Sequence, residues 1–394
     1  MRTNIRLWTA ALAIALGTLT AGAVVNSAGG TPLRRERTTT DPAIAMANLE
    51  GSLTTLDAKL KAGSAPPARR AELAELLMMR AQCLGRVSDT ERAAGIAFTL
   101  VQEDPRNGAL ILLRGRTRAA LHLFPQALKD FDEASQAGAD ASAVTGARAS
   151  VLQAIGRVDE AIALRIALAQ AKPDIVSLGS LAVAQGEGGD LAAASVTFER
   201  ARKIYRDVSP FALAWVYFQE GKLYFAAGAF ERAHELFAAA VDQLPSYAAA
   251  AGHLGEVEAA LGRKAEAAKR LRAVAATTED PDSEGQLCRV LLDLGQTAEA
   301  ESCRIRVSAR YDSALKRHPE AFWDHAAEFF LAMHEPHKAL GSARQNLALR
   351  PSRAAFDLFA KAAAAAGAAS EASSVAKRGA RLARRHSPGL WSND

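Results

Sequence analysis

The sequence contains none of the short motifs that most often mark an active site. It has no G-x-S-x-G nucleophile turn, no phosphate-binding G-x-x-x-x-G-K loop and no H-E-x-x-H zinc motif. His234-Glu235 begins the last of these, but Ala238 stands where the second histidine is required. The glycine-rich run Gly186–Asp190 follows no strand-like segment, so it does not fit a nucleotide-binding fold. We therefore expect no enzyme and no cofactor.

Positive charge is in little excess outside the N-terminus, although the net charge of the chain is +5. Residues 1–40 hold five arginines and one glutamate, a net charge of +4, which leaves +1 for the rest of the chain. A nucleic-acid footprint needs basic residues gathered on a folded face. The basic cluster Ala376–His386 equally fits the solvated face of a last capping helix. We therefore expect no nucleic-acid partner.

Alanine recurs at a regular interval along most of the chain. In the numbering of the sequence, the steps from one such alanine to the next are 34, 34, 33, 39, 34, 33, 39 and 33. Glycine stands five positions before the alanine in six of the nine units, and proline twelve positions after it in four. A period in this range is typical of a solenoid of stacked supersecondary units. The nine repeat alanines are Ala93, Ala127, Ala161, Ala194, Ala233, Ala267, Ala300, Ala339 and Ala372.

Each unit predicts two helices joined by a tight turn. Apolar residues recur at helical spacing on both sides of the glycine, as in Phe225 before it and Phe230, Ala233 and Phe237 after it. The glycine ends the first helix, and the proline ends the second because it has no amide hydrogen. The small alanine lets the two helices approach closely. The sequence therefore predicts nine helical hairpins and almost no sheet.

The segment Ala214–Tyr247 resembles a tetratricopeptide repeat. Its residues at the signature positions of that family are Tyr217, Gly221, Tyr224, Gly228, Ala233, Phe237, Ala240 and Pro245. Arg165 and Arg304, in other units, stand where the family usually has an apolar residue. The resemblance covers roughly residues 74–386. It implies an all-α, right-handed superhelical solenoid of about nine hairpins whose concave groove binds a protein or peptide.

The two longest steps divide the solenoid. The extra residues fall near Asp207 and near Lys316, where we expect longer helices, and Ser209-Pro210 predicts a helix start. The predicted divisions are a signal peptide or signal anchor (1–25), a flexible linker (26–40), an N-terminal capping helix region (41–73), repeats 1–4 (74–207), repeats 5–7 (208–316), repeats 8–9 with a C-terminal cap (317–387) and a tail (388–394).

The N-terminal segment 1–25 has the layout of a secretory signal. Two arginines precede an apolar run over residues 7–25, and no acidic residue appears before Glu36. Ala21-Gly22-Ala23 fits a cleavage site, but the run is also long enough to span a bilayer if it is not cut. Either outcome predicts a protein that is exported, being periplasmic or anchored in the inner membrane and facing the periplasm.

Three cysteines are too few for a disulfide framework. Cys288 and Cys303 nevertheless fall on the two helices of one hairpin, at the same height on either side of the turn near Gly295. In an oxidising compartment they could form a disulfide. Two buried free thiols would fit the same positions.

Eight of the chain's aromatic residues lie between Phe211 and Phe237. In tetratricopeptide proteins the first helix of each unit lines the groove, so the resemblance gives a set of partner-binding residues. Aromatic side chains are common interface anchors. Burial of the extra aromatics against the preceding unit would explain them equally well. The predicted groove residues are Trp215, Phe218, Lys222, Phe225, Arg116, Gln153, Glu256 and Arg289.

A second unusual segment, His318–Pro336, combines aromatic and polar residues. Asp324, His325 and Glu328 could bind a polar ligand, or they could belong to an exposed helix surface. Four histidines lie between residues 318 and 337, but a helix would spread them over roughly 20 Å, too far apart to converge on one metal ion. No metal site is therefore expected.

These observations favour a non-enzymatic scaffold that binds a protein or peptide partner outside the cytoplasm. The alternative is a small-ligand or metal-handling envelope protein that uses the segment from His318 to His337. The residues do not identify the partner or the oligomeric state.

Overall fold

The computed structural model describes the backbone of residues 39–385 and the side chains of residues 39–380. The predicted signal segment (1–25), most of the predicted linker (26–40) and the predicted tail (388–394) lie outside the described residues. Within the described part, every regular element is an α-helix. The all-α prediction is confirmed.

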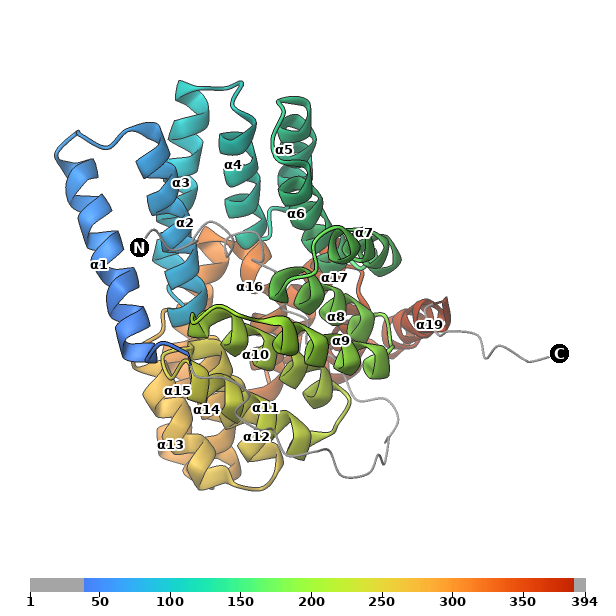
Figure 1. Cartoon of the computed structure of the whole chain (residues 1–394). Coiled ribbons are helices and arrows are strands. Elements are labelled where there is room, and N and C mark those ends of the chain that lie inside the picture. Colours follow the sequence, from blue (N-terminus) through green and yellow to red (C-terminus); the bar gives the residue numbers. More distant parts are fainter. Residues whose placement is uncertain (1–38, 386–394) are drawn as a thin grey trace.

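The described chain folds as helix α1 followed by nine antiparallel hairpins (Figure 1). We number the hairpins 1 to 9 in chain order, from α2–α3 to α18–α19. The helices are α1 (Pro42–Lys61), α2 (Pro67–Leu84), α3 (Val87–Glu103), α4 (Gly108–Ala120), α5 (Phe124–Gln136), α6 (Ala141–Ala154), α7 (Val158–Ala171), α8 (Ile175–Glu187), α9 (Leu191–Ile204), α10 (Pro210–Ala226), α11 (Phe230–Gln243), α12 (Ala248–Ala260), α13 (Lys264–Ala275), α14 (Asp282–Asp293), α15 (Thr297–Arg317), α16 (Pro319–Ala332), α17 (Pro336–Leu349), α18 (Arg353–Ala365) and α19 (Ala369–Arg385).

The repeat alanines lie where the two helices of each hairpin touch. All nine are buried, and seven of them are fully inaccessible to solvent. Four positions further along the second helix, Phe131, Phe198 and Phe237 are also fully buried. Burying a phenylalanine side chain stabilises a fold by roughly 1.5–3 kcal/mol. The repeat alanine therefore lies in the core of all nine hairpins, and the phenylalanine adds to that core in hairpins 2, 4 and 5.

The turn inside each hairpin uses a left-handed backbone conformation. Gly156, Gly228 and Gly262 have φ values of 80°, 75° and 80°. His122 and His334 occupy the same place in hairpins 2 and 8, each with a φ of 58°. Glycine adopts this conformation without the steric strain that a Cβ atom introduces. The repeat thus imposes the turn even where glycine is missing.

Each of the two 39-residue intervals between repeat alanines contains a longer helix, as expected. Helix α10 has 17 residues and α15 has 21, whereas α11 has 14 and α13 has 12. Helix α10 begins at Pro210 with Ser209 at its N-cap position, but the Ser209 side chain forms no capping hydrogen bond. The predicted start of this helix is therefore confirmed.

Of the two possibilities left open for Cys288 and Cys303, the structure contains the disulfide. Cys288 of α14 and Cys303 of α15 are bonded, with their Cα atoms 5.5 Å apart. Cys83 is a buried free thiol, and burial raises its pKa to about 12. The bond joins the two helices of hairpin 7 across their core.

The solenoid coils far enough to contact itself. The turn of each of the first three hairpins meets the segment at the start of the hairpin six places later. In hairpin 1, the Gly85 carbonyl accepts hydrogen bonds from the backbone N–H groups of Glu279 (3.0 Å) and Asp280 (3.2 Å). Ser88 donates to the Glu279 carboxylate from its N–H and its hydroxyl, both at 2.7 Å. Hairpin 1 is thereby attached to the loop before hairpin 7.

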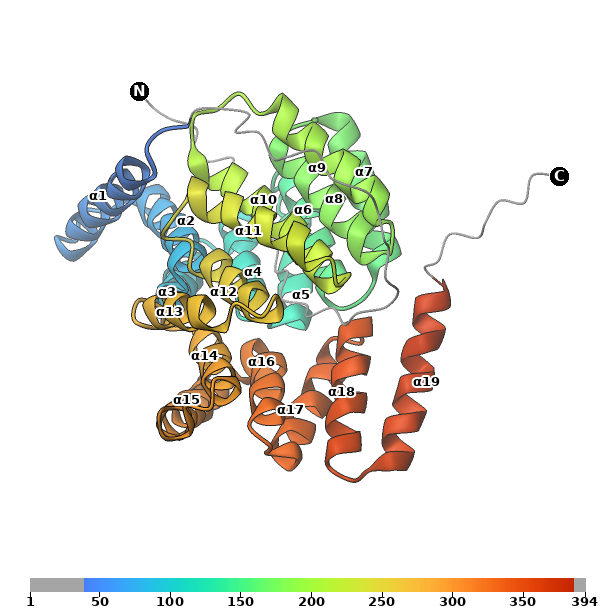
Figure 2. The same ribbon diagram turned by 90° about the horizontal axis from the view of Figure 1, so that it is seen from below.

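The next two hairpins repeat this contact. In hairpin 2, the His122 Nδ1 atom lies 3.1 Å from the carbonyl oxygen of Glu320, at the start of hairpin 8. In hairpin 3, a Cβ atom placed on Gly156 would come within 2.9 Å of the Pro351 carbonyl oxygen, just before hairpin 9. Figure 1 shows the orange helix α16 at the lower end of α4, and Figure 2 shows α14–α19 following one another from left to right along the lower part of the view. We call these three attachments the cross-turn contact.

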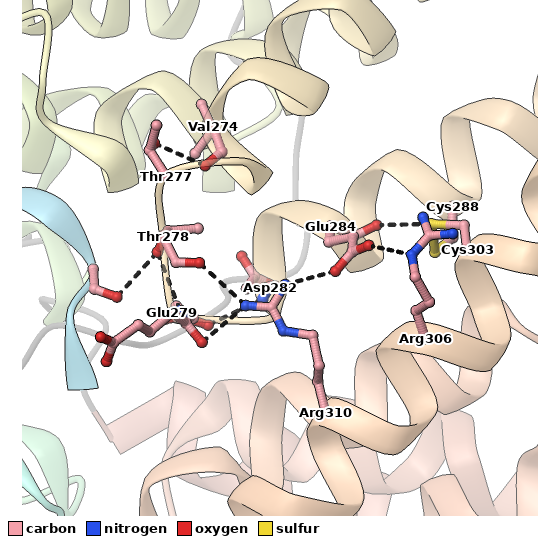
Figure 3. Close-up of polar contacts among 12 residues, drawn as sticks. Val274, Thr277, Thr278, Glu279, Asp282, Glu284, Cys288, Cys303, Arg306 and Arg310 are labelled. Atoms are coloured by element: carbon pink, nitrogen blue, oxygen red, sulfur yellow. Dashed lines mark hydrogen bonds and ion pairs between the residues drawn. A yellow bond between two sulfur atoms is a disulfide. The ribbon is translucent and has the colours of Figure 1, made fainter. Parts of the chain in front are cut away.

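One arginine holds the loop that makes the first attachment. Arg310 of α15 donates to the carbonyl oxygens of Thr278 (3.2 Å) and Glu279 (2.9 Å) and to the Glu284 carboxylate at 2.6 Å. Figure 3 shows Thr278 and Glu279 on this loop beside the blue ribbon of the N-terminal hairpins. In a simple solenoid each repeat contacts only its neighbours, so the cross-turn contact adds long-range restraint to this one.

Among residues 39–385, no helix combines the length and the apolar composition that spanning a bilayer would require. The apolar run of residues 7–25 lies outside the described residues.

Candidate binding surface

Successive first helices contact one another along one side of the solenoid, as in α2–α4, α12–α14 and α14–α16. Arg116 of α4 lies 3.4 Å from Glu75 of α2, and Arg289 of α14 lies 3.5 Å from Glu256 of α12. We call this side the inner face. Its central position is the residue eleven places before each repeat alanine. This position is held by Gln82, Arg116, Ser150, Val183, Lys222, Glu256, Arg289, Glu328 and Lys361.

Two of the predicted groove aromatics lie inside the core. Trp215 and Phe218 are each only 6% exposed. The Trp215 ring fills the space over Gly179, where a Cβ atom would come within 2.7 Å of it. Phe218 packs against the rings of Tyr247 and His253 at 5.1 and 5.4 Å. Both side chains therefore join hairpin 5 to its neighbours, which fits the burial alternative.

The other two predicted residues of α10 reach the surface in part. Phe225 is half-buried and packs against Phe230 at 5.4 Å. The Lys222 ammonium lies 5.4 Å from the centre of the Phe218 ring. Burial lowers the pKa of Lys222 to about 8, although the charge of Glu187 acts in the opposite direction. Lys222 is thus partly exposed and yet strongly desolvated.

The remaining predicted groove residues are spread along the inner face. The Arg116 side chain is 10% exposed, and burial is the main cause of its lowered pKa. Gln153 is buried and bonds to Glu187. The Glu256 carboxylate lies 3.0 Å from the Nδ1 atom of His253. The structure thus places polar predicted residues on several first helices, without bringing them to a single point.

Asp324 and His325, predicted as a polar ligand site, are engaged inside the protein. The Arg350 guanidinium lies 2.6 Å from the Asp324 carboxylate, and both side chains are at most 5% exposed. His325 Nδ1 lies 3.3 Å from Asp282. Burial raises the pKa of Asp324, but Arg350 and His325 overcome this and lower it to about 2.

The surrounding groups strengthen this buried cluster. Asn346 accepts two hydrogen bonds from Arg350, at 2.9 and 2.6 Å. Burial lowers the pKa of His325, yet the charges of Asp324, Asp282 and Asp280 raise it well above its usual value. Glu328 is half-buried one helical turn further along. Neither Asp324 nor His325 lies on an exposed helix surface, so that expectation was wrong for these two residues.

No metal centre is evident in the part of the chain that the structure describes, because no group of three His, Cys, Asp or Glu residues there could hold an ion. The histidines of the second segment have separate surroundings. His318 Nε2 lies 2.7 Å from Glu91, His325 faces Asp282, and His334 is exposed on a turn.

Sequence reasoning missed two charged residues that adjoin the inner face. Arg165 was noted only as a departure from the repeat pattern, and Glu187 only as part of a glycine-rich run. In the structure Glu187 bonds to Gln153, and its charge acts on both Arg165 and Lys222. A signal for Arg165 was available, because a charged residue at a position that is a buried phenylalanine in three other hairpins requires a polar environment.

Comparison with known proteins supports the architecture. Residues 224–286 match the tetratricopeptide repeat family. The dimer of human IFIT1 with m7Gppp-AAAA resembles the fold with a TM-score of 0.53 and 15% identity, over 84% of this chain and 76% of that one. The IFIT1 dimer with PPP-AAAA gives 0.52 and 16%, over 86% and 79%.

A tetratricopeptide repeat protein from Parabacteroides merdae ATCC 43184 matches 73% of this chain and 98% of its own, with 13% identity and a TM-score of 0.39. No curated protein matches the chain. At these identities the likeness shows the fold alone. The chain is thus similar to tetratricopeptide solenoids, and its function must be argued from its own residues.

Proposed function

We propose that this chain is a non-enzymatic scaffold that binds a protein or peptide partner through the inner face of its solenoid. One observation carries the proposal. Charged side chains recur at the central inner-face position on α4, α10, α12, α14, α16 and α18. Arg116, Lys222 and Glu256 are only partly exposed, whereas Arg289 is 42% exposed. A row of this kind suits an extended polypeptide that contacts several hairpins in turn.

The arrangement does not resemble a catalytic site. Nucleophilic catalysis needs a nucleophile, a base and an orienting group within hydrogen-bond reach of one another. The charged groups of the inner face instead contact the adjacent first helix, as Arg116 contacts Glu75 and Arg289 contacts Glu256. This spacing supports recognition along a surface rather than chemistry at a point.

We also propose that the folded part lies outside the cytoplasm. The Cys288–Cys303 disulfide supports this, because such bonds persist in oxidising compartments. The charge and hydrophobicity of residues 1–25 support it independently. Fusion of residues 1–40 to a reporter that is active only after export should give activity. Activity only with a reporter that works in the cytoplasm would contradict the proposal.

RNA is a competing class of partner, since the IFIT1 structures contain PPP-AAAA and m7Gppp-AAAA. The net charge of +1 from Asp41 onward offers little attraction for a phosphate backbone. Binding of the purified protein to PPP-AAAA at physiological salt tests this class directly. Tight binding there would replace the polypeptide proposal with an RNA one.

Site-specific photo-crosslinking tests the inner face. A photoreactive residue replaces Glu256 or Arg289 on the inner face, or Val196 or Ile305 as controls. The controls are 68% and 57% exposed and lie on second helices. We expect polypeptide adducts in cell-envelope fractions from the two inner positions and few from the controls. Adducts that form mainly at Val196 and Ile305 would move the binding surface to the outer helices.

A further inference from the structure

Arg165 stands where three other hairpins have a buried phenylalanine. It is four positions after the repeat alanine Ala161, as Phe131, Phe198 and Phe237 are after theirs. Arg165 is only 3% exposed. Burying a guanidinium is unfavourable unless its N–H groups are satisfied. This residue therefore imposes a stability cost that a phenylalanine would not.

The polar environment of Arg165 satisfies it only in part. One terminal N–H group donates to the Ser150 hydroxyl at 2.6 Å, while the Nε–H group is buried without a hydrogen-bond partner among the described residues. Ser150 holds the central inner-face position of hairpin 3. The guanidinium therefore extends from the second helix α7 through the hairpin to the inner face.

Side chains from α8 and α10 complete the cluster. Glu187 bonds to Gln153, and its charge interacts with both Arg165 and Lys222. Glu187 and Lys222 keep part of their surface exposed, yet burial is the largest cause of the shift in both pKa values. Glu187 and Lys222 are therefore the members of the cluster that remain accessible from the inner face.

Arg304 shows that an arginine at this repeat position need not be buried. It is four positions after Ala300 in hairpin 7, but its side chain is 32% exposed. It forms ion pairs with Glu301 at 2.7 Å and with Glu335 at 3.0 Å. Arg304 thus pairs with two carboxylates near the surface, whereas the carboxylate whose charge acts on buried Arg165 is Glu187.

We propose that Gln153, Arg165, Glu187 and Lys222 form a subsite that binds an acidic side chain of the partner polypeptide. This inference rests on the proposed function, because it assigns one contact within the inner face. The cluster holds two cationic side chains and one carboxylate, so a carboxylate from a partner balances its charge. That carboxylate also accepts a hydrogen bond from the Arg165 guanidinium, whose donors Ser150 satisfies only in part. Guanidinium groups bind carboxylates through such paired contacts.

The test uses a fluorescent hexaglutamate peptide and the purified protein at low salt. The key variant is Arg165→Phe, which restores the residue found in hairpins 2, 4 and 5. We expect it to weaken hexaglutamate binding by about tenfold to a hundredfold, the usual effect of losing a hydrogen bond to a charged group. We also expect its melting temperature to rise, because a buried, partly unsatisfied charge is removed.

Two further variants keep the result interpretable. Arg165→Met repeats the test with a flexible side chain, in case the phenylalanine ring does not fit beside Ser150. Arg304→Phe makes the same substitution at the matched position of hairpin 7 and should leave hexaglutamate binding within about twofold of the parent, as expected for an exposed charge.

Three outcomes would overturn the subsite. They are failure of the parent protein to bind hexaglutamate, undiminished binding by both Arg165 variants, and preference of the site for PPP-AAAA over hexaglutamate. Photo-crosslinking at Glu256 and Arg289 distinguishes failure of the subsite from failure of the proposed scaffold function. If polypeptide adducts persist there while any of these outcomes holds, the scaffold proposal stands and the subsite alone fails.

Discussion

The turns of hairpins 3 and 6 have the same backbone conformation but opposite surroundings. Gly156 and Gly262 both have a φ of 80°. Gly156 lies against the Pro351 carbonyl oxygen, whereas a Cβ atom on Gly262 would meet nothing within 4 Å. His122 and His334 repeat the comparison, since both have a φ of 58° but His122 is 1% exposed and His334 lies on the surface.

The comparison separates two levels of organisation. The hairpin itself dictates the left-handed turn, so the turn is alike in all parts of the solenoid. The cross-turn contact depends on how far the whole superhelix has rotated after six hairpins. A change in the turn of hairpins 1–3 therefore disturbs a second part of the protein, while the same change in hairpins 5 or 6 stays local.

The largest effect is expected from Arg350→Ala, beside the attachment of hairpin 3. The substitution leaves the buried Asp324 carboxylate without its cation. Breaking a buried pair in this way costs about 3–5 kcal/mol of unfolding free energy. Chemical denaturation of the variant and the parent protein measures it.

Arg344→Ala is the matched control for Arg350→Ala. The ion pair of Arg344 with Glu371 has both side chains more than a third exposed, at 54% and 38%. Its loss should cost less than about 1 kcal/mol. Equal losses in the two variants would mean that the buried cluster does not stabilise hairpins 8 and 9 as described.

The second prediction tests the comparison at the two turn glycines, Gly156 and Gly262. Gly156→Ala and Gly262→Ala should each lose about 1–2 kcal/mol, because alanine is strained in a left-handed turn. Gly156→Ala should lose about 1–3 kcal/mol more, because its Cβ atom overlaps the Pro351 backbone. Equal losses in urea denaturation would show that the cross-turn contact does not form in solution.

The sequence predicted the hairpins because their determinants are local. Alanine and glycine at fixed spacing dictate close helix packing and a left-handed turn within a single repeat unit. The cross-turn contact could not be predicted in this way. It joins Gly85 to Glu279 and Gly156 to Pro351, pairs that are far apart in the sequence, through small rotations that accumulate over six hairpins.

The candidate site was predictable in part for a similar reason. Polar residues such as Lys222 and Glu256 could be assigned to the inner face by repeat position. Trp215 and Phe218 lie on the same first helix as Lys222, but Gly179 on the preceding first helix leaves space that the Trp215 ring fills. Whether an aromatic residue anchors a partner or fills a gap depends on the residue opposite, which repeat spacing does not reveal.

A third prediction concerns acid stability near the cross-turn contact. The Asp324 pKa falls from its usual 3.8 to about 2 in the folded protein. A carboxyl group with a lowered folded pKa stabilises the fold above its unfolded pKa, and this stabilisation is lost as the pH falls from about 4 to 2. The loss should approach about 2 kcal/mol. Denaturation at pH 5, 3 and 2 should show a smaller acid loss in Asp324→Asn than in the parent protein.

The smallest effects are expected at the two histidine turns, where the same substitution should change the stability of the fold in opposite directions. His334→Gly should stabilise the protein by up to about 0.5 kcal/mol, since glycine relieves the left-handed strain and no buried contact is lost. His122→Gly should destabilise it by about 1–2 kcal/mol. The second variant loses the bond to the Glu320 carbonyl and the stacking on Phe124 at 5.1 Å, which outweigh the relief of strain. Thermal unfolding at neutral pH measures both, because burial lowers the His122 pKa to about 3 and keeps the ring neutral there. If both variants were stabilised alike, the His122 ring would have no structural role in joining hairpins 2 and 8.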